Sequence, residues 1–503
     1  MIRFQASLIV LLATVCAPLA ARAFQYGGPH GTASLTGYVE VRGACAFERD
    51  TPEEDPSGEL GLELKASSAS WNSLKVFIQG VQDGTVIDPG SSRVFNDFDR
   101  VYQDRSPSVD IDEAYVDFYT GDVDIRVGVQ KFAWGRLDEV NPTDNLNTED
   151  LTEGGTNDEV DRKIGVPALK VNLYSNLANV EIGWVPFYVP YRLPTAEERW
   201  FPRVLVPPST IDAGHSVGTI PVRASYPEID LPRGTIENSE AGIRVSRHIG
   251  GWDVSASYFT GYDMMPLVDT PVDLDVELAD PLALDYDVTA RVAMEPVLHR
   301  MHVFGLDFTT TVSDFTLRGE YAYFHNKHYN RKLDSILEEL VTRDRIDALL
   351  SDFLADYLTS GGRDTRRTFR LDPETDVQMD AMKYGLGLDY IHGDTSVSVQ
   401  CIQEFIPDYD SDRPVYFNKD GLDTLLTFLF KQFFLQNTME FNLRAAYDIE
   451  LKDYIARPSL KYSFTDRLQG TVGLIVIGGK YDDSLLGQFQ DNDQAFARLR
   501  CSF

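Results

Sequence analysis

About eighteen segments of roughly ten residues alternate apolar with polar side chains along this chain of 503 residues. Alternation with a period of two is typical of a strand whose two faces meet different surroundings, and this length lets a tilted strand cross a bilayer. The pattern predicts an all-β fold, a transmembrane antiparallel up-and-down β-barrel of about 18 (roughly 16–18) strands. The segments are 35–47, 59–66, 73–81, 109–119, 122–132, 168–174, 179–187, 237–247, 252–260, 301–311, 315–325, 381–390, 395–405, 424–434, 439–449, 455–464, 468–477 and 494–503.

The connections between these segments alternate between short turns and long loops. Turns such as 120–121, 248–251 and 312–314 are short. The long loops are 82–108, 133–167, 188–236, 261–300 and 326–380. If the short turns face the periplasm, so do both termini, as expected for an exported barrel with an even strand count. A soluble β-sandwich is the alternative, but it would not need its long loops on one side only.

The first 23 residues resemble a secretory signal peptide. Arg3 precedes an apolar run over 8–20, and Ala21-Arg22-Ala23 has the small-x-small form of a cleavage site. We expect 24–503 to be the mature barrel, located in the outer membrane of a Gram-negative bacterium among lipid and lipopolysaccharide. Loss of Arg3 and Arg22 changes the formal charge of −32 to −34. Beyond the signal no apolar run approaches the roughly 18 residues of a membrane helix.

The alternation also assigns the two faces of each strand. Apolar side chains should face lipid, and the charged side chains between them should line the lumen, because charge on the lipid face is costly. The candidate pore-lining residues are Arg42, Lys75, Asp124, Arg126, Gln130, Arg244, Arg318, Glu320, Glu440, Arg444, Arg498 and Arg500. A wall of mixed charge suits a channel for small hydrophilic solutes. The simpler alternative is that these ions pair across strands and only keep the lumen wet.

Acidic side chains are concentrated in the outer loops, in the runs 149–161, 269–287 and 408–412. Loop-bound Ca²⁺ or Mg²⁺ could bridge such carboxylates, although none has the spacing of a dedicated calcium loop. The histidines show no metal-ligand spacing with an acid or thiol partner. We therefore expect no metal site and no resident cofactor, and no basic surface indicates nucleic-acid binding.

One long loop carries a helical pattern. Apolar residues recur at three- and four-residue spacing from Arg331 to Ser360, which predicts one or two amphipathic helices in the loop 326–380. Ser360-Gly361-Gly362 should end them. An apolar stripe must be buried, by folding into the barrel mouth as a gate, by capping the loops, or by docking a partner. We favour the gate, because long loops without a function are uncommon.

Two further stretches need an interpretation. Between Val185 and Pro208, prolines stiffen an aromatic-rich loop that either stacks on a sugar or, as we expect, packs on the barrel rim. Thr195 and Glu198 have capping-box spacing, which predicts one helical turn there. Gly214-His215-Ser216-Val217-Gly218 matches the nucleophile-elbow pattern, but its flanks lack the required strand and helix. We expect a chance match and no enzyme.

The segment 126–144 resembles a block found in a large, mostly uncharacterised family of porin-like outer-membrane proteins. A strand ending in Gly-x-Gln is followed there by Trp-Gly and then Asn-Pro-x-Asp. The matching residues are Gly128, Gln130, Trp134, Gly135, Asn141, Pro142 and Asp144. The stretch 185–191 is similar to a second block of that family. Alginate-export channels resemble the layout more distantly, but their basic conduit is not evident in a lumen of mixed charge.

This resemblance implies an outer-membrane channel and no particular substrate. We expect residues 133–161 to fold into or across the lumen. The candidate constriction-loop residues are Trp134, Gly135, Arg136, Asp138, Asn141 and Asp144. The alternative is a rigid turn on the rim without contact to solute. A closed barrel whose acidic outer loops bind a partner or surface component is the second functional hypothesis, and the sequence leaves open whether the chain forms a homo-oligomer.

Overall fold

The computed structural model describes residues 24–47, 54–68, 73–83, 108–154, 162–194, 199–213, 218–227, 231–263, 265–280 and 285–503. Three features expected from the sequence lie outside these ranges. They are the signal peptide 1–23, the helical turn between Thr195 and Glu198, and the serine motif around Ser216.

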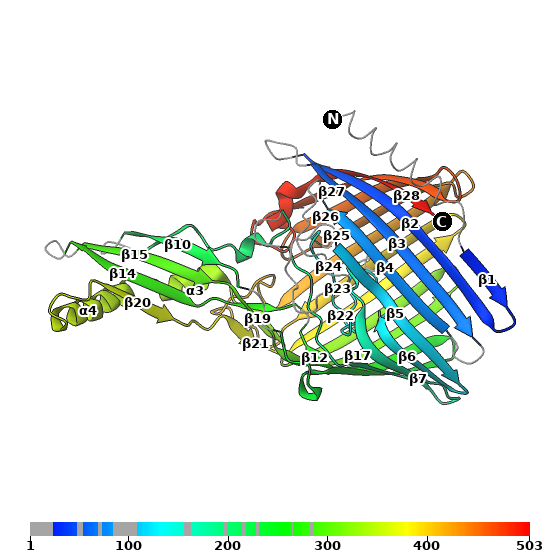
Figure 1. Cartoon of the computed structure of the whole chain (residues 1–503), viewed down its shortest axis with the longest axis horizontal. Helices are drawn as coiled ribbons and strands as arrows, with labels where there is room; N and C mark the ends of the chain where they lie inside the picture. Colours follow the sequence, from blue (N-terminus) through cyan, green and yellow to red (C-terminus); the bar gives the residue numbers. More distant parts are fainter. Residues whose placement is uncertain are drawn as a thin grey trace.

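Eighteen antiparallel strands form a closed barrel, which occupies the right half of Figure 1. The last strand pairs with the first, from Tyr38↔Ser502 to Ala46↔Gln494, and this pairing closes the sheet. In barrel order the strands are β2 (Gly31–Ala46), β3 (Glu54–Ser68), β4 (Ser73–Asp83), β5 (Ser108–Thr120), β6 (Val123–Gln130), β7 (Val166–Leu173), β8 (Asn179–Val185), β11 (Glu240–Ile249), β12 (Trp252–Tyr262), β17 (Arg300–Val312), β18 (Phe315–His325), β22 (Ala381–His392), β23 (Thr395–Phe405), β24 (Leu422–Phe434), β25 (Met439–Asp448), β26 (Asp453–Ser463), β27 (Leu468–Gly479) and β28 (Gln494–Ser502).

The predicted barrel is confirmed, and each of the eighteen predicted segments overlaps one of these strands. One strand of the barrel sheet was missed: β1 (Phe24–Gly28) folds back on the start of β2. The pairing of β28 with β2 ends where the backbone of Phe503 is hydrogen-bonded to Gly37, and β1 pairs with the residues of β2 that precede Gly37. β1 therefore lies in line with β28 along the same edge of β2. Phe24 at the start of β1 and Phe503 therefore lie at the same rim of the barrel.

The barrel wall is apolar outside and ionic inside. On β17, the side chain of Leu306 is 56% exposed on the outer face, whereas its neighbour Asp307 is only 4% exposed. Leu386, Val399 and Val472 on other strands are also exposed. A soluble protein shows the opposite arrangement, so a wall of this kind fits a lipid environment.

A second unit, here called the outer domain, extends from one end of the barrel (Figure 1). Its sheet has the order β20-β14-β15-β10-β9 and is assembled from three loops that are far apart in the sequence. The strands are β9 (Thr210–Asp212), β10 (Thr219–Ser225), β14 (Val272–Asp280), β15 (Asp285–Ala293) and β20 (Arg366–Leu371). The helices α3 (Leu333–Leu340) and α4 (Arg343–Thr359) lie on one face of the sheet. In the described part of the chain, no helix is both long and apolar enough to span a bilayer.

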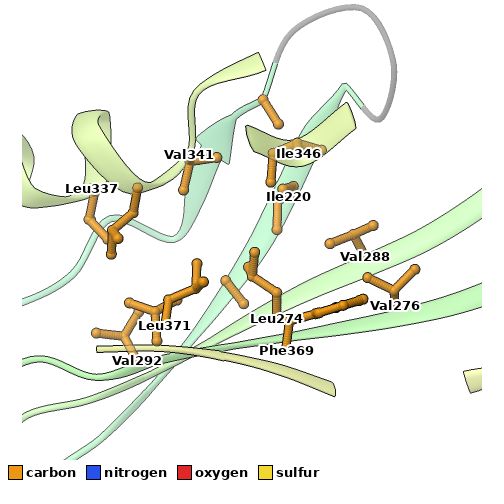
Figure 2. Packing of buried hydrophobic residues seen from close by; sticks show 14 of the residues in the cluster. Ile220, Leu274, Val276, Val288, Val292, Leu337, Val341, Ile346, Phe369 and Leu371 are labelled. Carbon is orange, nitrogen blue, oxygen red and sulfur yellow. The ribbon is translucent and has the colours of Figure 1, made fainter. Parts of the chain in front are cut away.

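The helices were predicted correctly, but the favoured gate was wrong. Their apolar stripe, including Leu337 and Ile346, packs with Leu274 and Val292 of the outer sheet rather than in the barrel mouth (Figure 2). The strands supply a complete apolar face, so the stripe is buried without entering the lumen. Gly361 and Gly362 have positive φ and end α4 as expected.

Short pairs of strands connect the outer domain to the barrel. They are β13 (Leu267–Asp269) with β16 (Glu295–Val297), and β19 (His328–Asn330) with β21 (Asp376–Gln378). Three short 3-10 helices, Arg203–Leu205, Ile236–Asn238 and Gly487–Asn492, lie in other connections. The aromatic-rich loop supports the rim interpretation, because Trp200 packs on Phe489, with ring centroids 5.5 Å apart, and on Ile475 of β27.

Candidate functional site: a loop folded into the barrel

The connection from β6 to β7 enters the space enclosed by the barrel. We call residues 131–165 the inner loop; its residues 155–161 are not among those described. Its ends are adjacent, since Gln130 pairs with Val166 in the sheet. Phe132, Trp134 and Leu146 are buried in one cluster with barrel residues such as Phe259. Apolar packing therefore holds the start of the inner loop against the wall.

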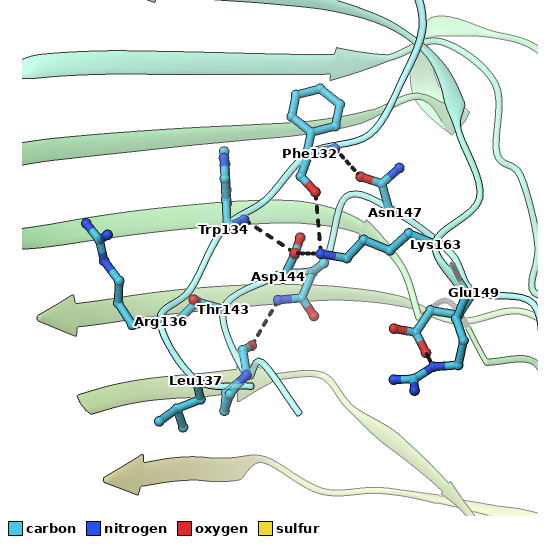
Figure 3. Close-up of polar contacts among 12 residues, drawn as sticks. Phe132, Trp134, Arg136, Leu137, Thr143, Asp144, Asn147, Glu149 and Lys163 are labelled. Atoms are coloured by element: carbon cyan, nitrogen blue, oxygen red, sulfur yellow. Dashed lines mark hydrogen bonds and ion pairs between the residues drawn. The ribbon is translucent and has the colours of Figure 1, made fainter. Parts of the chain in front are cut away.

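The first turn of the inner loop is fastened by polar side chains (Figure 3). The carboxylate of Asp144 accepts a hydrogen bond from Trp134 N–H at 3.3 Å and contacts Lys163 Nζ at 2.5 Å. Asn147 accepts from Phe132 N–H at 2.5 Å and donates to the carbonyl of Ile164 at 2.8 Å. These contacts tie the outgoing limb of the loop to the returning limb.

Glu320 on β18 binds the backbone of the inner loop. Its carboxylate accepts from Arg136 N–H, from Leu137 N–H at 2.6 Å, and from the Thr143 hydroxyl at 3.1 Å. Gly135 leaves room for this carboxylate, because a Cβ there would lie 2.7 Å from Glu320 Oε1, and its φ of +89° suits glycine. Several backbone donors converging on one carboxylate make an anchor with a defined geometry.

Ion pairs extend the inner loop to strands around the barrel. Arg136 Nε lies 3.0 Å from Asp307 of β17, and Arg318 of β18 pairs with Asp138 at 2.6 Å. Asp138 N–H also donates to Gln400 Oε1 of β23 at 3.1 Å. Farther along, Glu139 lies 3.0 Å from Arg444 of β25, and Glu153 pairs with Arg42 of β2. A loop that leaves from β6 and touches all these strands must cross the lumen.

A cavity of about 260 Å³ lies along the wall formed by β25 to β28 and β2, and we call it the wall cavity. Its lining is mostly polar. The residues are Glu40, Glu440, Asn442, Arg444, Arg457, Ser459, Lys461, Gln469, Thr471, Phe496, Arg498 and Arg500. Five of these side chains are cationic and two are anionic. The sequence indicated a mixed lumen, whereas the strand register groups cations on this wall.

Other candidate pore-lining residues lie in pairs away from the wall cavity. Lys75 pairs with Glu113, and Arg126 with Asp117 at 2.7 Å. Arg244 pairs with Asp307 at 3.1 Å, beside Arg136. Asp124 accepts from the Tyr174 hydroxyl. The structure thus brings Arg42, Arg318, Glu320 and Arg444 to the inner loop, and Glu440, Arg444, Arg498 and Arg500 to the wall cavity.

Several motif residues fasten the loop instead of facing solute. Gln130 is fully buried and donates to the carbonyl of Ala168 at 2.9 Å. Trp134 is buried and donates through Nε1 to Glu181 at 2.7 Å. Asn141 accepts at its backbone carbonyl from Asp144 N–H at 3.1 Å. By contrast, 43% of the Asp138 side chain is exposed. Sequence reasoning singled out Glu139 beside Arg136 and Asp138 but missed Glu153 and Lys163, because nothing in the pattern shows which residue each would meet.

Two groups of side chains that could serve as metal ligands were not indicated by the spacing in the sequence. His299 and His328 stack with ring centroids 3.9 Å apart, and both lie close to the carboxylate of Asp376 at the base of the outer domain. Burial, together with the neighbouring His328, lowers the pKa of His299. The ligand atoms of this trio lie close enough together to hold one metal ion. The same is true of a separate acidic group, Asp423, Asp448 and Glu450. Within the described residues, neither group falls in the acidic runs considered for Ca²⁺ or Mg²⁺.

Comparisons with solved structures find barrels from outer-membrane porins. OccAB4 of Acinetobacter baumannii has 10% identity and a TM-score of 0.46, covering 94% of this chain and 97% of that one. OccK2 (OpdF) of Pseudomonas aeruginosa, in complex with glucuronate, has 8% identity and a TM-score of 0.46 with the same coverage. OmpF of Salmonella typhi, in complex with daunomycin, has 9% identity and a TM-score of 0.40, covering 95% and 100%. At these identities the likeness concerns the fold alone.

Sequence comparison gives a family but no characterised relative. None of the curated proteins matches the chain. Residues 79–503 match the model of a family described as Protein of unknown function (DUF1302). Because this match covers most of its length, the chain belongs to the DUF1302 family.

Proposed function

We propose that the protein is an outer-membrane channel for passive or substrate-selective passage of small hydrophilic solutes, with the inner loop as its constriction. The observation that carries this proposal is the anchoring of the inner loop to strands around the lumen, through Glu320, Arg318 and Arg444. A loop held at so many points narrows a wide barrel to a defined passage. The wall cavity beside it supplies a polar path.

In this proposal the exported chain lies in the outer membrane after removal of residues 1–23. Its apolar outer face contacts lipid, and the end that carries the outer domain faces outward, toward lipopolysaccharide. Arg136 and Asp138 then stand at the narrowest part. The buried Trp134 and Asp144 position the loop and do not contact solute.

Swelling of liposomes that contain the purified protein tests this proposal. Passage should allow swelling in small neutral sugars, at a rate that falls as the sugar becomes larger than the constriction. A preparation of heat-denatured protein is the control for leaky vesicles. A folded barrel that gives no swelling with any sugar would contradict the channel.

The second candidate is a closed barrel whose outer domain binds a partner. It is favoured by the separate apolar core of the outer domain, which includes Ile220, Leu274 and Phe353. A unit with its own core can serve as a rigid platform outside the membrane. Absence of swelling together with saturable binding of the protein to a surface component would favour this function.

A further inference from the structure

We propose that His299, His328 and Asp376 bind a zinc ion where the outer domain joins the barrel. This zinc site goes beyond the proposed channel and does not depend on it. The three side chains converge, because each offers one ligand atom and these atoms all lie within 4.8 Å of one another. Two imidazoles and one carboxylate are a common set of protein ligands for zinc.

Two imidazole nitrogens approach the same carboxylate oxygen. Nδ1 of His328 contacts Oδ2 of Asp376, and Nε2 of His299 lies 3.9 Å from that oxygen. The two rings are stacked, with centroids 3.9 Å apart and an angle of 11° between their planes. Ligand atoms of a tetrahedral zinc ion lie about 2.0–2.2 Å from the metal and therefore about 3.3–3.5 Å from one another. Small side-chain rotations would bring the three atoms to that spacing.

The barrel topology brings these ligands together. β17, β18 and β22 are consecutive in the barrel, and each is joined to the outer domain by a connection that carries one ligand (Figure 1). His299 directly precedes β17, His328 begins β19 after β18, and Asp376 begins β21 before β22. Asn330 faces Asp376 across the β19–β21 ladder, so His328 and Asp376 are diagonal neighbours on one face.

Backbone hydrogen bonds fix the segments that carry the ligands. The carbonyl of His299 accepts from Asp263 N–H at 2.8 Å. The side-chain amide of Asn330 accepts from Val268 N–H at 3.0 Å and donates to the Val268 carbonyl at 2.9 Å, which joins β19 to β13. Ligands on such a fixed frame are already positioned before a metal binds.

The donor set favours zinc over calcium or magnesium. Imidazole nitrogens suit zinc and related transition metals, whereas Ca²⁺ and Mg²⁺ take oxygen ligands. The carboxylates of Asp263 and Asp269 act on His299 through their charge, although Lys327 lies 2.7 Å from Asp263 and offsets part of it. The three ligand side chains are 20–31% exposed, so an ion can enter from solvent and take water as its fourth ligand.

A bound ion would join three connections between the barrel and the outer domain. A metal clip between segments that are far apart in the sequence stabilises the folded arrangement, because it binds ligands that only the fold assembles. Zinc should therefore stiffen this junction. Hydrogen exchange of residues 328–330 and 376–378 should slow when zinc is added.

Isothermal titration calorimetry of the purified protein, without a histidine tag, tests the site. After EDTA treatment and removal of the chelator, zinc chloride should bind saturably with a dissociation constant in the micromolar range or below. H299Q and H328Q each remove one ligand and should raise that constant at least about tenfold. H392Q is the matched control, because His392 also pairs with a carboxylate, Asp314 at 3.2 Å, but at the opposite end of β22. Heat-modifiable migration on gels shows that each variant has folded.

X-ray absorption of the zinc-loaded wild type gives a second readout that needs no variant. The spectrum should show nitrogen and oxygen ligands at about 2.0–2.2 Å, with the scattering pattern of two imidazoles. A shell of oxygen ligands alone would place the ion on carboxylates and overturn the histidine site. The absence of saturable binding to the folded wild type would also overturn it, as would equal affinities of the wild type, H299Q and H328Q, or an equal loss in H392Q.

Discussion

The Arg318 guanidinium on the barrel wall and the Asp138 carboxylate on the inner loop form a two-point ion pair, with Nη1–Oδ1 and Nη2–Oδ2 distances of 3.0 and 2.6 Å. Arg318 also donates to the carbonyl of Arg136 at 2.6 Å and to Asp389 at 2.6 Å. One side chain therefore connects two positions of the loop to the wall. The two-point geometry fixes orientation as well as distance.

A double-mutant cycle measures this pair. D138N should destabilise the protein less than R318Q, because R318Q also removes the donors to Asp389 and to the Arg136 carbonyl. The coupling energy of the two sites should fall within about 0.5–3 kcal/mol. Urea unfolding of the two single variants and the double variant in detergent micelles gives this value. Additive effects would show that the two side chains do not interact in solution.

Removal of the Glu320 carboxylate should release the inner loop. E320A leaves Leu137 N–H and the Thr143 hydroxyl without their acceptor, at a cost of about 1–3 kcal/mol for the buried donors. Single-channel recordings should show a larger and noisier conductance, since a loosened constriction samples more open positions. E338Q, at an exposed position on α3, is the control. An unchanged conductance in E320A would mean that Glu320 does not hold the constriction.

Loss of a core side chain of the outer domain should destabilise that domain and leave the barrel intact. F353A removes a fully buried ring from the core between α4 and the outer sheet, and such changes cost about 3–5 kcal/mol. Limited proteolysis should cut residues 331–371 sooner in F353A, while heat-modifiable migration and conductance stay unchanged. L358A, at an exposed position of the same helix, should behave like the wild type. A parallel loss of barrel stability would show that the two units fold as one.

Acid should weaken one contact between the outer domain and the barrel rim. Lys332 Nζ lies 2.7 Å from Asp483 in the loop before β28, and this hydrogen bond lowers the pKa of Asp483 against the opposing effect of partial burial. A carboxyl with a depressed pKa stabilises the folded state above its unfolded pKa, about 3.9, and this contribution is lost as pH falls through the folded pKa. The contact should therefore be present at pH 5 and weaken toward pH 3.

Hydrogen exchange of α3 measures that change. After correction for intrinsic exchange rates, the protection of residues 333–340 should fall between pH 5 and pH 3 in the wild type. The same decrease should be smaller in D483N, which lacks the titrating group. Equal pH dependence in both proteins would assign the effect to other groups.

The barrel could be predicted from the sequence because the alternation of apolar and polar residues lies within each single strand. In β25, Phe441 and Leu443 alternate with Glu440, Asn442 and Arg444, so period and face can be read without knowledge of neighbouring strands. The inward course of the inner loop was also indicated, because Trp134 and Gly135 directly follow a strand. The residues that the inner loop contacts could not be predicted, since only closure of the barrel brings Glu139 to Arg444.

The outer sheet was missed although its signal was present. Val272, Leu274, Val276 and Leu278 alternate with acidic residues in β14, and this stretch was interpreted as an acidic loop. Its apolar face is buried only when β20 and the two helices, which lie later in the chain, pack against it. Because each loop alone lacks a partner for its apolar side, the domain depends on long-range assembly.

The most direct test of the central claim is the single-channel conductance of a barrel without the inner loop. Gln130 and Val166 are paired neighbours, so a short Gly-Ser turn can replace residues 131–165 without a change in strand register. If the inner loop is the constriction, the conductance should rise several-fold above the wild-type value and size exclusion should be relaxed. A folded variant with the wild-type conductance, or with none, would contradict the account.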